Sequence, residues 1–361
     1  MSKGSTMNKK ILVTAMGMAL AGGMSLANAD VKLYGQLDMS IDAVDVDGGS
    51  DDVNMGSNRS AIGFKGSEDL GNGLSAFFKS EWQVDLDDAG TAAGPLEDDT
   101  NEGDGKDGWK ARDQYIGMAM DGVGKIWFGM MSTAYKSPAS KLDPFYRTRN
   151  QARNVGIQST LHKGRGEEGQ GRATNTVRID TANFGGFQAF GTYTLDNSEA
   201  DGENDNPYSL GASFKQGGIY AFASYLTTNA GGDDSAWQIG GKFSMDAFAV
   251  WAMYEGDGGL ITLNQYGSAK AGTINEGSGD GADIWSVGAS FSIANNIVTF
   301  DYAQGDKVDD PTVTVDDYAV WRLGAKHNFS KRTNVYITHA NYDADEAGET
   351  DITSIGMRHN F

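Results

Sequence analysis

Residues 134–172 carry a concentration of basic side chains that could attract anions. This stretch reads AYKSPASKLDPFYRTRNQARNVGIQSTLHKGRGEEGQGR, and its only acids are Asp143, Glu167 and Glu168. The basic residues are Lys136, Lys141, Arg147, Arg149, Arg153, Lys163, Arg165 and Arg172. Charged groups around a narrow, low-dielectric passage bias which ions enter it. A second interpretation is that these bases pair with acids elsewhere and only hold the segment in place. The spacing of the residues does not choose between the two.

Other residue patterns that could support catalysis or metal binding are weak. The four histidines, His162, His327, His339 and His359, are scattered and form no i,i+4 pair, and the chain has no cysteine. We therefore expect no metal site. GRGEEG at 164–169 matches G-x-G-x-x-G by chance, because no strand leads through it into a helix. No serine has the G-x-S-x-G context of a hydrolase, so an enzyme is not expected, although spacing alone does not exclude a membrane hydrolase.

The N-terminus and the charge of the chain limit where the protein can act. Lys9 and Lys10 precede ILVTAMGMALAGGMSLANA, which has the apolar core and the small-x-small end of a secretory signal peptide cleaved after Ala29. Residues 1–29 would then be removed, leaving 30–361 as a single domain. The formal net charge of the whole chain is −20, which argues against a nucleic-acid partner.

The elements that position the basic segment are predicted to be β-strands. The stretch VKLYGQLDMSID at 31–42 places Val31, Leu33 and Leu37 on one face of an extended chain and polar residues on the other. We expect sixteen strands, at 31–46, 59–70, 73–86, 109–121, 124–133, 172–184, 186–197, 207–217, 218–229, 234–246, 247–257, 282–295, 296–308, 316–330, 333–344 and 350–361. Connections after even-numbered strands are tight turns, whereas those after odd-numbered strands are mostly longer. This parity is typical of an even-stranded barrel with both termini at one rim.

Several strands alternate as they would between lipid and water. In 285–293 and 298–302, large apolar side chains occupy one face and small or polar ones the other, with aromatic residues toward the segment ends. We therefore predict an all-β, 16-stranded antiparallel transmembrane β-barrel, with hydrocarbon outside and water inside. Residues 109–120 and 124–131 are apolar on both faces, so their orientation stays open.

Four stretches of the chain carry a resemblance to a known family: VKLYGQLDMSID, AIGFKGSEDLGNGLSAFFKSEW (61–82), VRIDTANFGGF (177–187) and the ending GMRHNF. Together they resemble the trimeric Gram-negative general porins of the outer membrane. The resemblance implies a homotrimer of 16-stranded barrels that act as passive diffusion channels, with long extracellular loops and the third loop, 134–171, folded inward. It also implies that Phe361 is a signal for the outer-membrane assembly machinery. Two departures are Ala61, where the family usually has arginine, and Gly129, which is followed by methionine instead of arginine.

The resemblance and the polar faces together nominate residues for an ion pathway. The constriction candidates are Lys136, Lys141, Asp143, Arg147, Arg149 and Arg153. The wall candidates are Arg59, Lys79, Arg178, Arg322, Lys326 and Arg358, together with Lys215 and Lys242, partly offset by Glu81, Asp180 and Asp301. Arg178, Arg322 and Arg358 are expected to face the constriction. The hypothesis is a passage of net positive potential that favours small anions.

The predicted long loops, by contrast, are acidic. Residues 85–107, 196–205, 306–317 and 343–351 are rich in Asp and Glu, which is typical of a solvated surface. A sharper hypothesis is that divalent cations bridge these carboxylates to lipopolysaccharide phosphates. No other cofactor is expected. The alternative function is a surface β-protein without a channel, such as an adhesin or structural antigen.

Overall fold

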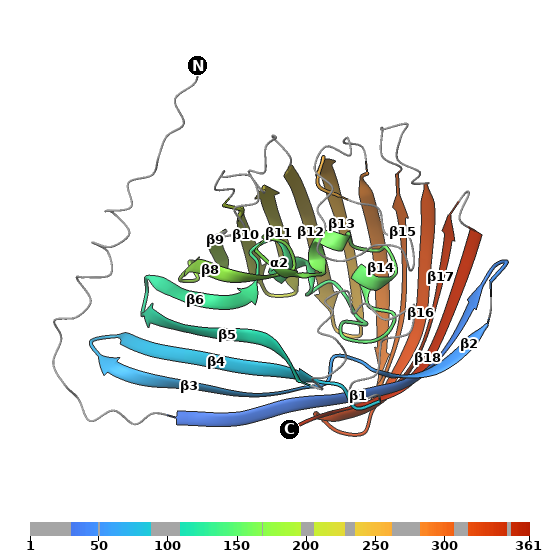
Figure 1. Cartoon of the computed structure of the whole chain (residues 1–361), viewed down its shortest axis with the longest axis horizontal. Helices are drawn as coiled ribbons and strands as arrows, with labels where there is room; N and C mark the ends of the chain where they lie inside the picture. The colour runs from blue at the N-terminus through green and yellow to red at the C-terminus, as the bar shows by residue number, and fades with distance from the viewer. Residues whose placement is uncertain are drawn as a thin grey trace, which may run out of the picture.

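The computed structural model is a closed β-barrel whose strands follow one another in chain order (Figure 1). It describes residues 30–49, 51–87, 109–167, 169–195, 206–227, 235–261, 282–306, 317–344 and 348–361. The predicted signal peptide, 1–29, and most of the predicted acidic loops lie outside these residues. Within the described ranges, no helix is both long and apolar enough to cross a membrane.

The predicted count of sixteen barrel strands is confirmed. The strands are β1 Asp30–Val46, β2 Asp52–Ser57, β3 Ala61–Gly71, β4 Leu74–Val84, β5 Trp109–Met120, β6 Gly124–Ser132, β7 Arg165–Gly166, β8 Arg172–Thr181, β9 Phe187–Thr194, β10 Tyr208–Gln216, β11 Ile219–Thr227, β12 Ser235–Met245, β13 Phe248–Gly258, β14 Ile284–Ile293, β15 Asn296–Gly305, β16 Tyr318–Asn328, β17 Thr333–Ala344 and β18 Gly348–Asn360. Two of these do not add a strand to the barrel. Strand β7 pairs only with β8, in parallel, and β2 and β3 pair with successive parts of β1 as one interrupted strand.

The interruption at residues 58–60 is a feature that the sequence did not reveal. Asn58 is buried there, and its side-chain amide donates to Ser40 Oγ at 2.7 Å and to Tyr336 Oη at 3.1 Å. Arg59 has a φ of 55°, a left-handed conformation that breaks the ladder. The strand predicted at 59–70 therefore begins at Ala61, and β2 lies in what the sequence suggested was a loop.

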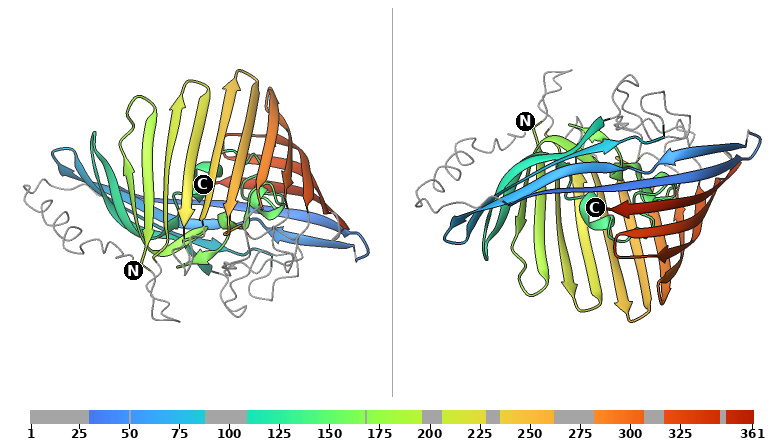
Figure 2. Two further views of the ribbon diagram at one scale, coloured as in Figure 1. Left: turned by 90° about the horizontal axis from the view of Figure 1, so that it is seen from above. Right: turned by 90° about the horizontal axis from the view of Figure 1, so that it is seen from below.

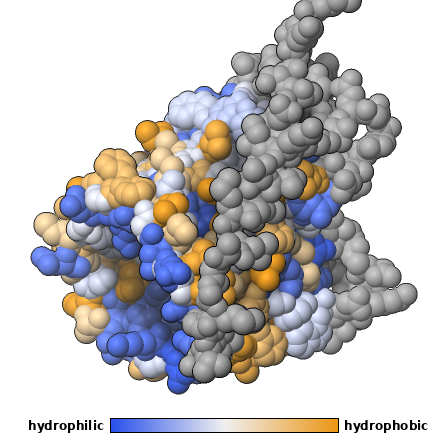
Figure 3. Space-filling view, turned by 90° about the vertical axis from the view of Figure 1, so that its left-hand side faces the viewer, coloured by the Kyte–Doolittle hydropathy of each residue, from blue (hydrophilic) through white to orange (hydrophobic). Residues whose placement is uncertain are grey.

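Alternation along the strands places apolar side chains outside the barrel, as predicted. On β15, Val298 and Phe300 are exposed, whereas Thr299 and Asp301 point inward and are buried. Large apolar side chains are exposed on most strands of the barrel, and Figure 3 shows hydrophobic patches interspersed with hydrophilic ones on one face of the molecule. An exposed apolar belt of this extent requires a nonpolar surrounding such as lipid.

Outward aromatic pairs mark two levels on the barrel. Phe248 and Phe291 have ring centroids 4.7 Å apart near the tight turns, and Trp237 and Tyr254 have centroids 5.3 Å apart near the long loops. Tyr254 lies six residues beyond Phe248 on β13, which is about 20 Å along a strand. This separation fits the two aromatic girdles of a membrane barrel, whose apolar band is about 25 Å tall.

The orientation left open for the apolar strands β5 and β6 is now clear. Ile116 and Phe128 are exposed on the outside. Trp127 points inward, where its ring lies 5.9 Å from that of Phe77 and 6.1 Å from that of Tyr115. The apolar residues on the second face therefore form an aromatic cluster inside the barrel.

The first and last strands close the barrel. Strand β1 pairs with β18 from Gln36 opposite Asn360 to Val46 opposite Thr350. The backbones of Gly35 and Phe361 exchange two hydrogen bonds of 3.0 and 3.1 Å. The Phe361 ring lies so close to Gly35 that a Cβ at this position would be 2.2 Å from it. A side chain at position 35 would therefore displace the C-terminal ring and press on the Ala61 carbonyl oxygen, which favours glycine there.

Loop 3, residues 133–171 between β6 and β8, folds into the barrel as the resemblance implied (Figures 1 and 2). It contains the short helices α2 Lys136–Ala139, η1 Ala152–Asn154 and η2 Thr160–His162. Its apolar residues Val155, Ile157 and Leu161 are buried in a cluster with inward side chains from β1, β11, β12 and β14–β18. Loop 3 is thus packed against the wall on one side of the interior.

Candidate functional site

Arg322 on β16 is the first of two buried centres that fix loop 3. Its side chain is fully buried and forms salt bridges with Asp301 of β15 and, at 3.1 Å, with Asp143 of loop 3. The same guanidinium donates to the carbonyl of Asn150. Asp143 in turn accepts a hydrogen bond from the backbone N–H of Ala152 at 2.8 Å. Arg322 therefore binds both the wall and the middle of the loop.

Glu255 on β13 is the second buried centre. It accepts hydrogen bonds from Tyr135 Oη at 3.0 Å, from Ser159 N at 2.7 Å and from Ser159 Oγ at 3.0 Å. His162 Nε2 lies 2.7 Å from the same carboxylate, and both side chains are buried. One wall carboxylate thus joins the start of loop 3 to its later part, so the loop is held at several points along its length.

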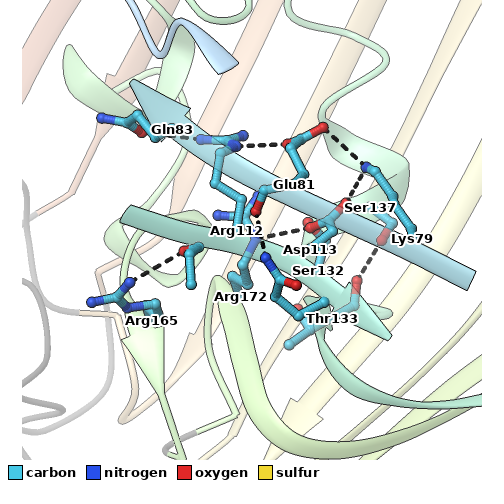
Figure 4. A network of polar contacts seen from close by, with 12 residues as sticks. Lys79, Glu81, Gln83, Arg112, Asp113, Ser132, Thr133, Ser137, Arg165 and Arg172 are labelled. Carbon is cyan, nitrogen blue, oxygen red and sulfur yellow. Dashed lines mark hydrogen bonds and ion pairs between the residues drawn. The ribbon is translucent and has the colours of Figure 1, made fainter. Parts of the chain in front are cut away.

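A polar network links strands β4 and β5 to the opposite side of loop 3 (Figure 4). Glu81 on β4 receives Arg112 Nε at 2.7 Å, Arg147 Nη2 at 3.3 Å and Lys79 Nζ at 3.3 Å. Arg112 also donates to Gln83 Oε1 at 3.1 Å. Cations from two strands and from loop 3 therefore share a single carboxylate.

The neighbouring carboxylate, Asp113 on β5, is shared in the same way. It forms salt bridges with Lys79 and, at 2.9 Å, with Arg172 at the start of β8. Nearby, Arg165 Nη1 donates to the backbone carbonyl of Ala111 at 3.2 Å. Figure 4 shows these side chains converging from β4, β5 and the ends of loop 3. The network supplies more cations than carboxylates.

The excess of positive charge is greatest around Lys136. This side chain is 4 % exposed, and burial lowers the pKa of its ammonium well below the usual value. The neighbouring guanidiniums of Arg153, Arg172, Arg59 and Arg112 lower that pKa further. Like charges gathered at this density make the region attractive to anions. Of these five cations, Lys136 and Arg153 were predicted for the constriction and Arg59 for the wall, whereas Arg112 and Arg172 were assigned to neither.

A second group of cations lies nearer the tight turns. Burial lowers the pKa of the Lys141 ammonium, and the charges of Lys215, Arg178 and Lys125 act in the same direction, whereas Asp180 opposes them. Asp180 is already engaged by Arg178 at 2.8 Å. Lys141 itself lies 4.9 Å above the ring of Tyr220. The wall candidate Lys215 therefore lies in the same electrostatic environment as the constriction candidate Lys141.

The structure places the remaining predicted residues at different positions in the barrel. Arg322 was expected to face the constriction from the wall, but it is completely covered by loop 3 and balanced by Asp143 and Asp301. Arg358 pairs with Asp38 of β1 and donates to the carbonyl of Tyr146 in loop 3 at 3.0 Å. Arg322 and Asp143 therefore pair with each other and hold loop 3 in place, which is the second of the two interpretations of the basic segment.

The other candidates contact different parts of the interior. Arg178 donates to the backbone carbonyl of Ser132 at 2.9 Å, close to where loop 3 begins. Lys242 lies 5.5 Å above the ring of Trp251 inside the barrel. Lys326 and the loop residue Arg149 are partly exposed.

Four further residues escaped the sequence analysis as parts of the site. Arg112 and Asp113 belong to the strand whose orientation was left open, and a register shift between Ser80 and Trp82 places them opposite Glu81. Arg172 was counted with the basic segment but was not assigned to the constriction. Glu255 was not nominated at all, although its position among the alternating residues of β13 indicates that it points inward.

The barrel, its apolar belt and its charged interior define a class of protein, the transmembrane β-barrel channel. The family model described as Gram-negative porin matches residues 13–347, and the chain therefore belongs to the Gram-negative porin family. It is a channel of the outer membrane, as predicted, and the alternative of a surface protein without a channel is not favoured.

Individual relatives agree with this membership, and solved structures share the fold. The chain is 26% identical to the major outer membrane protein P.IB of Neisseria meningitidis serogroup B, over 98% of this chain and 100% of the relative. It is also 26% identical to an outer membrane porin protein of Bordetella pertussis, with the same coverage of both chains. Among solved structures, the anion-selective porin from Comamonas acidovorans has a TM-score of 0.70 at 20% identity, covering 92% of this chain and 100% of that one. Salmonella typhi OmpF, solved in complex with daunomycin, has a TM-score of 0.69 at 15% identity, covering 92% and 97%.

Proposed function

We propose that this porin prefers anions and that loop 3 together with β4, β5 and β8 forms its selective region. The observation that carries the proposal is the clustering of Lys79, Arg112, Arg147 and Arg172 around only two carboxylates, Glu81 and Asp113. Arg153 and Arg59, which lie close enough to lower the pKa of Lys136, add further positive charge. An anion entering this region meets a favourable potential, and a cation meets a barrier. The anion selectivity named for the Comamonas acidovorans porin is consistent with this proposal.

Reversal potentials across a KCl gradient in planar bilayers test the proposal. We expect a chloride-to-potassium permeability ratio above one, with Arg153→Gln and Arg172→Gln each lowering it. A unit charge about 6 Å from an ion's path in water-like surroundings changes the ion's population about threefold. The control Lys331→Gln removes a cation from an exposed turn and should leave the ratio nearly unchanged. Preference for potassium in the unmodified protein would overturn the proposal.

We further propose that the channel is a homotrimer that acts by passive diffusion and without catalysis. Membership of the porin family supports passive transport, and the family resemblance supports three barrels per particle. Crosslinking in outer membranes followed by electrophoresis without heating should give a band of three chains. A single-chain band under these conditions would contradict the homotrimer.

The remaining proposed partners are lipopolysaccharide, divalent cations at the acidic loops, and the assembly machinery acting through Phe361. Of the acidic stretches, the structure describes only some residues; there, no group of three or more acidic or histidine side chains is placed to hold a metal ion. Addition of a chelator to isolated outer membranes should lower the melting temperature of the assembled protein if cations bridge it to lipid phosphates. An unchanged melting temperature would end the bridging hypothesis.

A further inference from the structure

Tyr146 is held among arginines at the centre of loop 3. The guanidinium carbon of Arg153 lies 5.3 Å from the centre of its ring, and that of Arg147 lies 5.9 Å away. Its backbone carbonyl accepts a hydrogen bond from Arg358 Nη2 at 3.0 Å, and Arg358 is itself paired with Asp38 across the closing seam. The ring is partly exposed inside the barrel. The side chain is thus fixed at a defined place in the selective region.

Taken together, the charged groups on the elements packed near Tyr146 are predominantly cationic. Loop 3 contributes Arg147 and Arg153 together with Lys136, β4 contributes Glu81 and Lys79, β5 contributes Arg112 and Asp113, β8 contributes Arg172, and β18 contributes Arg358. The two carboxylates are already shared among several cations. A negative charge that appeared on the phenol oxygen would therefore be stabilised.

The acidity of the phenol agrees with this environment. Burial alone would raise the pKa of Tyr146, but the guanidiniums of Arg153, Arg147, Arg112 and Arg172 lower it to about 7. The usual value for tyrosine is about 10. The effect is mutual, because Tyr146 and Glu81 raise the pKa of the Arg147 guanidinium despite its burial.

We propose that Tyr146 is a specificity-determining residue of the channel, because its phenol releases a proton to water and the resulting phenolate neutralises one positive charge of the selective region. This inference rests on the proposed anion preference. It adds that the strength of the preference is set by the protonation state of one tyrosine. The channel is then most anion-preferring in mildly acidic medium and becomes less so as the medium turns alkaline.

The test compares reversal potentials of the unmodified protein and Tyr146→Phe at pH 5.5, 7 and 8.5. In the unmodified protein, we expect the chloride-to-potassium permeability ratio to fall about threefold between pH 5.5 and 8.5. Tyr146→Phe keeps the ring between the two guanidiniums and should retain the acidic-pH ratio throughout. Tyr220 is another inward-facing tyrosine in contact with loop 3 and serves as the control. In Tyr220→Phe, the permeability ratio should change with pH as it does in the unmodified protein.

The outcomes separate this inference from the proposed function. A protein that prefers cations at every pH refutes the anion preference itself. A protein that prefers anions equally at all three pH values refutes only the role of Tyr146. A pH dependence that persists in Tyr146→Phe also refutes it, and would assign the titration to another group such as Lys136.

A spectroscopic titration keeps the inference testable if the variant fails to fold. Of the 14 tyrosines in the chain, one should ionise near pH 7 in the unmodified protein. The ionisation is followed as the increase in ultraviolet absorbance that tyrosinate shows over neutral tyrosine. Absence of any tyrosine ionisation below pH 9 would overturn the proposal without need of a variant.

Discussion

Replacement of Arg322 by methionine tests whether buried charge pairing positions loop 3. Arg322 is completely buried between Asp301 and Asp143 and also donates to the Asn150 carbonyl. Arg322→Met leaves both carboxylates without their cation. Removing one partner of a buried ion pair costs about 3–5 kcal/mol, because the remaining charge has lost its hydration as well as its partner. The two acids can recover hydration only if loop 3 moves away from β15 and β16.

The expected result is a partial release of the loop. The centre at Glu255 still binds Ser159 and His162, so the later part of loop 3 stays docked while the part near Asp143 leaves the wall. Single-channel conductance should become larger or noisier, and protease should cleave near residues 143–150 in the variant only. The control Lys326→Met changes a cation on the same face of β16 that is partly exposed, and should leave cleavage unchanged.

A compensating variant decides the cause. Arg322→Met combined with Asp143→Asn and Asp301→Asn removes all three charges, and replacing a buried ion cluster by neutral groups is often close to neutral in stability. The combined variant should therefore regain protease resistance. If Arg322→Met alone keeps the conductance and resistance of the unmodified protein, the reasoning that this cluster positions loop 3 is wrong.

Three further variants test the second anchor, the seam and the orientation of the wall. Glu255→Ala leaves four polar atoms of loop 3 without their acceptor, at about 1–3 kcal/mol for each one that stays buried, and should expose residues 155–162 to protease. Gly35→Val introduces a Cβ that collides with the Phe361 ring and with the Ala61 carbonyl oxygen 2.8 Å away, so the barrel should unfold at lower temperature in a gel-shift assay. Phe300→Lys should destabilise folding into lipid vesicles by about 2–4 kcal/mol. Ser290→Lys, at a partly exposed position on the inner face of β14, should fold normally. Equal yields from the two variants would contradict the assigned faces.

The barrel could be predicted because its information is local. Each strand shows its own two-residue alternation, and each tight turn shows its own turn residues, as with Asn72 and Gly73 at φ values of 55° and 76° between β3 and β4. The interruption at residues 58–60 could not be predicted in this way. It depends on Asn58 meeting Tyr336, a residue 278 positions later, which no local pattern reveals.

The site could be predicted only in outline for the same reason. Composition showed that the inward loop is basic, and alternation showed correctly that Arg322 points inward. Alternation does not tell whether an inward side chain meets water or protein, and Arg322 meets Asp143, a partner 179 residues away. The sequence also did not tell whether Arg112 points into the barrel or out of it, because β5 is apolar on both faces and carries a bulge in its pairing with β4.

The two sides of loop 3 differ in how charge is balanced, and this difference explains how one segment both stays in place and selects ions. Toward β13–β16, Arg322 and Glu255 are fully buried, and each is matched by partners of complementary charge or polarity. Such pairs fix geometry but leave little net potential. Toward β4, β5 and β8, cations outnumber carboxylates around Glu81 and Asp113, which leaves a potential that passing ions can sense. Contacts around Arg322 and Glu255 can therefore be made more stable without changing ion selectivity. A change of charge around Glu81 and Asp113 should alter ion selectivity before it alters the position of loop 3.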